Sequence, residues 1–203
     1  MTEKEKARLG LLYDANYDEE LLAERRRCKE LCFQFNQLSP LKELEQKEIK
    51  EGLIKASDIG KLFGKTKENF CVTAPFYCDY GYNIEIGENF YSNHNLVILD
   101  GAKVEIGDNV FIAPNCCITT AGHPINIDER NRGLEYAYPI KIGNNVWIGA
   151  GANILPGVTI GDNVTIGAGS VVNKSIPANS IAVGNPCKVI KTILDKTKGV
   201  NSN

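Results

Sequence analysis

A mainly β fold, in which parallel coils follow a helical segment, is predicted by two features of the 203-residue sequence. The first is a change of composition near residue 70, where charged helix-forming residues give way to Gly, Asn, Ile and Val. The second is a six-residue repeat after that change. Its branched apolar positions are Ile106, Ile112 and Ile118, then Ile142, Ile148, Ile154, Ile160, Ile166 and Val172. Because a period of six fits neither an α-helix nor a heptad, the repeat predicts a parallel β-helix.

The helical segment is predicted to cover residues 1–66. Asp18 is suited to cap a helix, because its short side chain accepts hydrogen bonds from free backbone N–H groups. After it, residues at spacings of three and four form one stripe that we expect to be buried. The stripe consists of Leu21, Leu22, Arg25, Cys28, Leu31, Cys32 and Phe35. A second helix is predicted from Pro40 to a stop at Gly60 or Gly64.

Residues 67–186 form the predicted β-helix. Three six-residue units make one triangular coil of about 18 residues, and each unit supplies a short strand and a corner. The apolar residue of each unit points into the prism, so stacked coils bury one aliphatic column. Gly-x-Asn follows the anchor isoleucines, as in Ile106 to Asn109. Both Gly and Asn tolerate the left-handed backbone that a corner needs.

One interval in the repeat is too long for a single coil. The anchors Ile106 and Ile142 lie 36 residues apart, which allows two coils or one coil with an insertion. Steps of six from Ile118 lead to residues that do not suit an aliphatic column, namely Pro124, Arg130 and Tyr136. We therefore expect residues 121–139 to leave the prism as a long loop, and loops of this length are usually functional.

The end of the chain, residues 187–203, is predicted to hold a helix and a tail. A helix from Cys187 to Lys196 would cover the last coil, because an uncovered solenoid end leaves strand edges unpaired. The expected organisation thus has three parts: a helical segment, a β-helix with one extruded loop, and a C-terminal capping helix.

Composition limits the classes of partner. The 23 basic and 25 acidic residues nearly balance, unlike those of nucleic-acid-binding proteins. Apolar runs such as Leu96–Leu99 are far shorter than the roughly 20 residues that cross a membrane, and Met1–Arg8 leads into no apolar signal segment. The seven cysteines include no Cys-x-x-Cys pair, which favours reduced thiols. We expect a cytoplasmic protein with no nucleic-acid or membrane partner.

The two histidines are the first candidates for chemistry. His123 stands where the rigid coil meets the expected loop, and histidine is the usual general base near neutral pH. The alternative is a loop histidine that only holds hydrogen bonds. His94 is interpreted as structural. Because two histidines cannot supply a three-histidine zinc site, no metal is expected.

Several segments together resemble the maltose and galactoside O-acetyltransferases of the hexapeptide-repeat superfamily. They are Thr119–Pro124, Ile142–Gly149, Pro156–Asn163, Gly167–Val172 and Gly184–Pro186, with Phe35–Asn36 and with Cys78–Ile84, which is most similar to the maltose branch. The resemblance covers nearly the whole chain. It implies a left-handed parallel β-helix, a homotrimer with active sites between neighbouring subunits, and acetyl-CoA as the donor.

The resemblance also implies roles for residues near the acceptor. His123 is similar to the base that takes a proton from the acceptor hydroxyl and returns it to the CoA sulfur. Asn93 is similar to an amide that assists beside that hydroxyl, with an asparagine turn ladder as the alternative. The residues that resemble acceptor contacts are Asp14, Arg25, Asp79, Tyr91, Asn93 and Asp100. At the N-terminus, Asn16 and Asp18 stay open as alternatives to Asp14.

For the donor, the resemblance implies contacts along the later coils. The matching residues are Trp147, Ala150, Ala168, Asn173, Lys174, Lys188 and Lys191. Trp147 resembles a residue that lines the pantetheine arm, and a backbone N–H near Ala150 would face the carbonyl oxygen as its negative charge builds. Lys188 and Lys191 stand where relatives commonly have arginine, so the positive charge is kept but the two-pronged contact with a phosphate is lost.

The resemblance therefore implies an acetyl-CoA-dependent O-acetyltransferase that transfers acetyl directly to a small sugar such as maltose, glucose or a galactoside. One alternative is a hexapeptide acetyltransferase of another acceptor, such as an antibiotic, serine or a nucleotide sugar. The other is a non-catalytic hexapeptide scaffold that binds partners through its flat flanks. The presence of His123, Asn93 and Trp147 together favours an enzyme.

Overall fold

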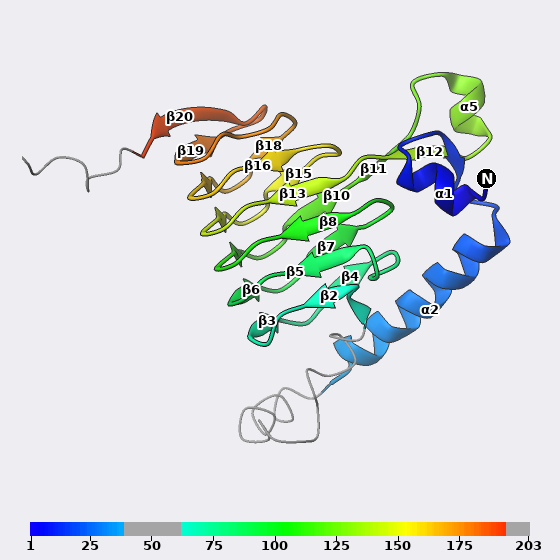
Figure 1. Cartoon of the computed structure of the whole chain (residues 1–203), viewed down its shortest axis with the longest axis horizontal. Helices are drawn as coiled ribbons and strands as arrows, with labels where there is room; N and C mark the ends of the chain where they lie inside the picture. Colours follow the sequence, from blue (N-terminus) through cyan, green and yellow to red (C-terminus); the bar gives the residue numbers. More distant parts are fainter. Residues whose placement is uncertain (39–61, 194–203) are drawn as a thin grey trace, which may run out of the picture.

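A stack of parallel coils forms the body of the protein (Figure 1). The computed structural model describes residues 1–38 and 62–193. Three sheets enclose the interior as the faces of a prism, and the chain passes from face 1 to face 2 to face 3 in each coil. This is the hexapeptide-repeat type of β-helix that the period of six predicts.

The strands of each face are short and, apart from the last, parallel. Face 1 contains β2 (Lys65–Thr66), β5 (Ile84–Ile86), β8 (Val104–Ile106), β13 (Ile140–Ile142) and β16 (Thr159–Ile160). Face 2 contains β3 (Phe70–Val72), β6 (Phe90–Ser92), β9 (Phe111–Ile112), β14 (Trp147–Ile148), β17 (Thr165–Ile166), β19 (Ser180–Val183) and β20 (Lys188–Thr192). Face 3 contains β4 (Phe76–Cys78), β7 (Leu96–Leu99), β10 (Cys117–Thr119), β15 (Asn153–Ile154) and β18 (Val171–Val172).

The predicted aliphatic column fills the prism. Ile142 pairs in register with Ile106 on one side and with Ile160 on the other. These three side chains are at most 4% exposed, as are the remaining isoleucines of the repeat. Because burying one such side chain contributes about 1.5–3 kcal/mol, the column is a major source of stability. The inward orientation of the repeat is confirmed.

Asn and Gly serve different purposes at the corner between faces 1 and 2. Asn109 and Asn145 have φ values of 56° and 55°, in the left-handed region, and the Asn109 amide donates to Asn145 Oδ1 at 3.2 Å. Gly107 has no such φ. A Cβ at Gly107 would lie 2.7 Å from the carbonyl oxygen of Gly143 in the next coil. The expectation that both residue types take the left-handed backbone is corrected: Asn takes it, whereas Gly lets the coils approach closely.

The helix predicted after Asp18 is α2 (Glu19–Asn36), which runs along one side of the prism (Figure 1). Asp18 Oδ1 accepts the N–H of Leu21 at 2.9 Å and so caps the helix. Four members of the predicted stripe are buried and the others are half-buried. A short helix before it, α1 (Glu3–Arg8), was not predicted. The helix predicted from Pro40 lies in the residues 39–61 outside the described ranges.

The excursion predicted at residues 121–139 is present but is not a simple loop. It contains β11 (Ala121–Gly122), α5 (Ile127–Asn131) and β12 (Leu134–Ala137). The N-terminal strand β1 (Tyr13–Asp14) pairs antiparallel with β12, which pairs antiparallel with β11. The chain then rejoins the prism in register, because β13 pairs with β8. The long interval is therefore one coil plus an insertion, and backbone hydrogen bonds fasten that insertion to the N-terminal segment.

The prediction of a C-terminal capping helix is wrong. Residues 188–192 form β20, which pairs antiparallel with β19 and covers one edge of face 2. Antiparallel pairing satisfies the strand edge that a helix was expected to cover. The last residues of the expected helix, 194–196, lie outside the described ranges.

Two further observations concern membranes and thiols. No helix within residues 1–38 or 62–193 combines the length and hydropathy needed to span a membrane. All seven cysteines are free thiols, as the cysteine pattern indicated.

Candidate active site

His123 follows β11 at the base of the insertion, with its ring held by the opposite strand. The ring atom Nδ1 lies 3.1 Å from the carbonyl oxygen of Leu134 on β12. A carbonyl only accepts, so Nδ1 donates, and in the neutral ring the lone pair lies on Nε2. Nε2 lies 3.8 Å from Glu135 Oε1, and half of the side chain is exposed. An exposed, oriented imidazole with a free Nε2 is the arrangement that a general base requires.

Glu135 was not predicted, although its Oε1 lies 3.8 Å from Nε2 of His123. The Tyr13 hydroxyl donates to Glu135 Oε2 at 3.3 Å, and the Asn16 amide donates to Glu135 Oε1 at 3.4 Å. Both partners belong to the N-terminal segment, far away in sequence. Because this contact depends on the pairing of β1 with β12, no local sequence pattern marks Glu135.

Asp14 faces the strand that holds the histidine. In the β1–β12 register it lies opposite Leu134, the residue whose carbonyl contacts His123. Its Oδ1 accepts the N–H groups of Asn16 and Tyr17 at 3.2 and 2.9 Å. Of the two alternatives, Asp18 is engaged as the cap of α2 and Asn16 is engaged with Glu135. The register therefore favours Asp14 as the acidic residue at this site.

Arg25 and Asp79 lie beside the same cluster. Arg25 donates to the Tyr80 hydroxyl at 2.7 Å and also to the carbonyl of Ala15, directly after β1. Burial raises the pKa of Asp79, which the positive charge of Arg25 opposes and the negative charge of Glu135 reinforces. The structure thus gathers an arginine and several carboxylates near His123, and such groups bind a polyhydroxylated ligand well.

The expectation that Asp100 contacts the acceptor is corrected, because this residue supports the backbone of its neighbours instead. Its side chain is completely buried, so a ligand on the surface of this chain cannot reach it. Oδ1 accepts the N–H groups of Asp79 and Tyr80 at 3.0 and 2.9 Å, while Oδ2 has no hydrogen-bond partner among the described residues. Burial raises the pKa of Asp100 to about 7. Asp100 therefore fixes the backbone that carries Asp79.

Tyr91 and Asn93 lie at a different edge of the prism. Asn93 follows β6, where the chain turns from face 2 to face 3, and its Oδ1 accepts the N–H of His94 at 2.7 Å. Backbone hydrogen bonds link successive coils at this corner. The N–H groups of Asn93, Ala113 and Gly149 donate to the carbonyls of Ile112, Ile148 and Ile166, respectively. We call this column edge 2–3. Figure 1 shows β6 on the opposite side of the stack from β11 and β12.

Most of the predicted donor residues share face 2 and edge 2–3. Trp147, 56% exposed, points outward from β14, and Lys191 stands three strands away in the same column. Ala150 and Ala168 are exposed on successive corners, linked because the Gly169 N–H donates to the Ala150 carbonyl at 2.8 Å. The Ala150 N–H itself has no acceptor in the described part of the chain. Lys188 is exposed at the end of β20 next to this edge.

Two donor candidates lie elsewhere. Asn173 and Lys174 follow β18, where the chain turns from face 3 to face 1, and both are exposed. We call this column edge 3–1. The insertion that carries His123 leaves the prism at the same edge, and Asp79 lies on it as well. The predicted site residues are therefore divided between two edges of one prism.

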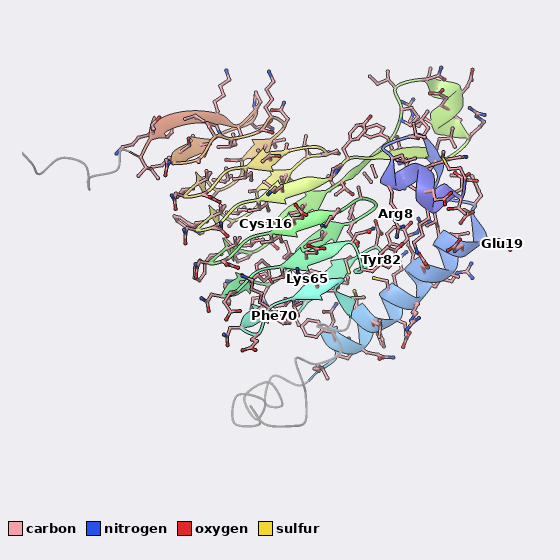
Figure 2. All side chains as sticks on the ribbon, in the orientation of Figure 1. Arg8, Glu19, Lys65, Phe70, Tyr82 and Cys116 are labelled. Atoms are coloured by element: carbon pink, nitrogen blue, oxygen red, sulfur yellow. The ribbon has the colours of Figure 1, made fainter. Side chains whose placement is uncertain are left out.

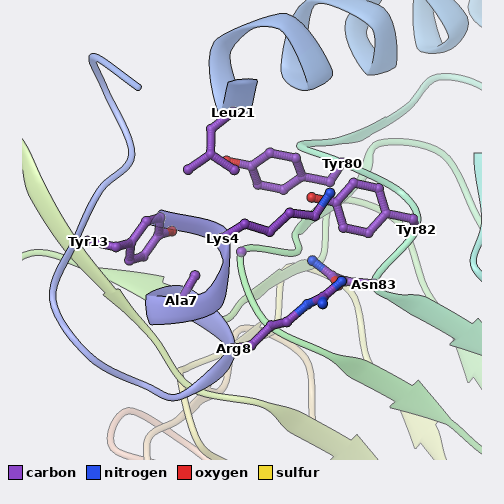
Figure 3. Close-up of a pocket in the computed structure, with 9 residues that line it drawn as sticks. Lys4, Ala7, Arg8, Tyr13, Leu21, Tyr80, Tyr82 and Asn83 are labelled. Carbon is purple, nitrogen blue, oxygen red and sulfur yellow. The ribbon is translucent and has the colours of Figure 1, made fainter. Parts of the chain in front are cut away.

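A small pocket under α1 adjoins the cluster near His123 (Figure 3). It is lined by Lys4, Ala7, Arg8, Tyr13, Leu21, Tyr80, Tyr82, Asn83 and Gly101. Lys4 Nζ lies 4.4 Å from the centre of the Tyr82 ring and 2.6 Å from Glu24 Oε1, so its charge fastens α1 to α2 and the prism. His123 does not line the pocket, which we interpret as part of the packing of the N-terminal segment.

Two family models match the chain. The model described as "Bacterial transferase hexapeptide (six repeats)" matches residues 139–174. The model described as "Maltose acetyltransferase hexapeptide capping motif" matches residues 6–67. The first match falls on the coils and the second on the N-terminal segment that contacts the insertion.

Relatives extend this similarity over nearly the whole chain. The protein YJL218W of Saccharomyces cerevisiae, named as an acetyltransferase, is 57% identical over 187 residues, which cover 92% of this chain and 91% of the yeast protein. The solved maltose O-acetyltransferase from Clostridium difficile 630 is 51% identical, with a TM-score of 0.87, and covers 96% of this chain and 99% of its own. A galactoside acetyltransferase solved in complex with coenzyme A is 47% identical, with a TM-score of 0.87, covering 96% and 92%.

The coils, the capping segment and these matches define a hexapeptide-repeat acetyltransferase. Within that superfamily, the chain belongs to the maltose and galactoside O-acetyltransferase family. The motifs around His123 and Trp147 indicated the same family from the sequence.

Proposed function

We propose that the protein transfers acetyl directly from acetyl-CoA to a hydroxyl of a small sugar, such as maltose, glucose or a galactoside. Acetyl-CoA is the co-substrate, since solved relatives contain coenzyme A or acetyl-CoA. The family needs no metal. The observation that carries the proposal is the half-exposed His123 ring, whose Nδ1 lies 3.1 Å from the Leu134 carbonyl oxygen and whose Nε2 lies 3.8 Å from Glu135 Oε1.

The reaction needs one base and one oxyanion donor. His123 Nε2 takes the proton from the sugar hydroxyl while the hydroxyl oxygen attacks the thioester carbonyl. Negative charge builds on the carbonyl oxygen of the tetrahedral intermediate, where the unpaired N–H of Ala150 is the proposed donor. The carbon–sulfur bond then breaks, and the imidazolium returns the proton to the CoA sulfur. Asn93 is proposed to orient the acceptor hydroxyl, and no acyl-enzyme is formed.

The division of site residues between two edges supports a homotrimer with shared active sites. Edge 3–1 carries the base, whereas edge 2–3 carries Asn93 and Ala150. The outward side chains of face 1 include one row of charged residues, which are Lys65, Glu85, Glu105 and Lys141. Faces 2 and 3 present rows rich in apolar groups, including Phe111 and Trp147, which are 51% and 56% exposed, and Tyr77, which is 50% exposed. A threefold arrangement that places edge 2–3 of one subunit against edge 3–1 of the next would bring both sets of residues into one site.

Mixing two inactive variants tests the shared site. His123→Ala and Asn93→Ala should each be nearly inactive alone. When both chains are co-expressed in equal amounts, random assembly pairs an intact edge 3–1 with an intact edge 2–3 at about a quarter of the sites. Turnover should then recover to about a quarter of the wild-type value. If each site lay within one subunit, co-expression would restore nothing.

A panel of acceptors tests the substrate class. Purified protein is supplied with acetyl-CoA and with maltose, glucose, a galactoside, serine, chloramphenicol or a nucleotide sugar, while free CoA is measured. We expect CoA release with the simple sugars, and product mass increased by one acetyl group. Release with another acceptor alone would assign a different branch of the superfamily, and no release with any compound would favour the non-catalytic scaffold.

A further inference from the structure

Three thiols meet between α2 and the first coils, and none of them takes part in the proposed reaction. Cys28 and Cys32 are one helical turn apart on the buried side of α2, and Cys78 ends β4. The sulfur of Cys78 lies 3.5 Å from that of Cys28 and 3.9 Å from that of Cys32. All three sulfurs lie within 4.8 Å of one another, so they converge on a single point. We call them the thiol cluster.

The spacing suits a metal ion better than a disulfide. A disulfide joins its sulfurs at about 2.05 Å, well below the closest pair in the cluster. A metal ion bound to sulfur at about 2.3 Å holds three planar ligands about 4 Å apart. Two sulfur pairs already lie near that separation, and the third needs a shift of less than about 1 Å. Side-chain rotation on α2 supplies such a shift.

The environment of the thiol cluster favours a soft ion with few ligands. The three residues are 2%, 2% and 5% exposed, so water has little access as a further ligand. Zinc needs a fourth donor, whereas soft thiolate sets select copper(I). Side chains fill the space between α2 and the prism (Figure 2), and no other Cys, His, Asp or Glu ligand atom of the described residues joins the group.

We propose that Cys28, Cys32 and Cys78 form a three-coordinate site for copper(I), which clamps α2 to the prism. Each ligating S–H loses its proton to the buffer and each sulfur forms one bond to the ion, with no change in oxidation state. Because the metal joins a helix to a strand, it binds the folded chain and should raise the thermal midpoint. The site is independent of the acetyl transfer, so neither proposal depends on the other.

Copper(I) titration of the reduced full-length protein tests this site. Under anaerobic conditions, with the chelator bathocuproine disulfonate as competitor, the wild-type chain should retain one copper(I) and gain a thiolate-to-copper absorption band in the ultraviolet. Cys32→Ser should lower the affinity at least about tenfold and abolish the rise in thermal midpoint. The matched control, Cys71→Ser with Cys117→Ser, removes the two thiols that are not buried and should bind copper as the wild type does.

X-ray absorption of the copper-loaded wild type keeps the test independent of any variant. Three sulfur neighbours at about 2.3 Å are expected. Two sulfur neighbours, equal retention of copper by a Cys28→Ser and Cys32→Ser protein, or loss of copper in the surface control would each overturn the proposal.

Discussion

Replacing His123 with alanine is expected to lower turnover about 10²- to 10⁴-fold, the usual contribution of a general base. The ring is half exposed and is held by Leu134 on β12, so its removal leaves the hydrogen bonds between β11 and β12 in place. The KM for acetyl-CoA should change little, because the donor residues lie mostly on face 2 and edge 2–3. Steady-state kinetics with free CoA as the readout measures both constants.

His94→Ala is the matched control for that experiment. His94 is the other histidine of the chain, is also exposed, and contacts the carbonyl of Ala74 through Nδ1. Its loss should leave turnover within about twofold, because the His94 side chain takes no part in the proposed reaction. If His123→Ala kept more than a tenth of wild-type turnover with an unchanged circular dichroism spectrum, His123 would not be the base.

The architecture could be predicted because the repeat is a local signal. The six-residue period is written into every coil, and an interruption such as Pro124, Arg130 and Tyr136 marks the insertion without any knowledge of contacts. The same reasoning failed at the C-terminus. Lys188–Thr192 carries both charged and β-branched residues, and its strand conformation is decided by the open edge of β19, which lies in the tertiary structure.

The site was only partly predictable for a related reason. His123 stands at a visible break in the repeat, and Asp18 could be identified as a cap from neighbouring residues. Glu135 becomes important only when β1 pairs with β12, a contact between segments about 120 residues apart. The support role of Asp100 was also hidden, because an aspartate at a corner gives no sign of whether it faces a ligand or the backbone of the preceding coil.

The second large effect is expected from a charge inside the column. Ile160 is completely buried on β16, in register with Ile142 and bridged to Ile176 in the next coil. Ile160→Asp removes an apolar contact worth about 1.5–3 kcal/mol and places a carboxyl where the neighbouring side chains are aliphatic. The cost should exceed about 4 kcal/mol, a large part of the 5–15 kcal/mol that stabilises a typical domain. We expect loss of the cooperative unfolding transition or insoluble protein.

Thr159→Asp is the control one residue away, because alternate residues of a strand point to opposite sides of the sheet. Thr159 is exposed on face 1 and lies opposite Lys141, so a carboxylate there meets a positive charge in water. Its free energy of unfolding should stay within about 0.5 kcal/mol of the wild type. Urea unfolding followed by circular dichroism measures both variants. A soluble Ile160→Asp protein that unfolds at the same urea concentration as Thr159→Asp would contradict the inward column, because the two changes differ only in the side of the strand that receives the charge.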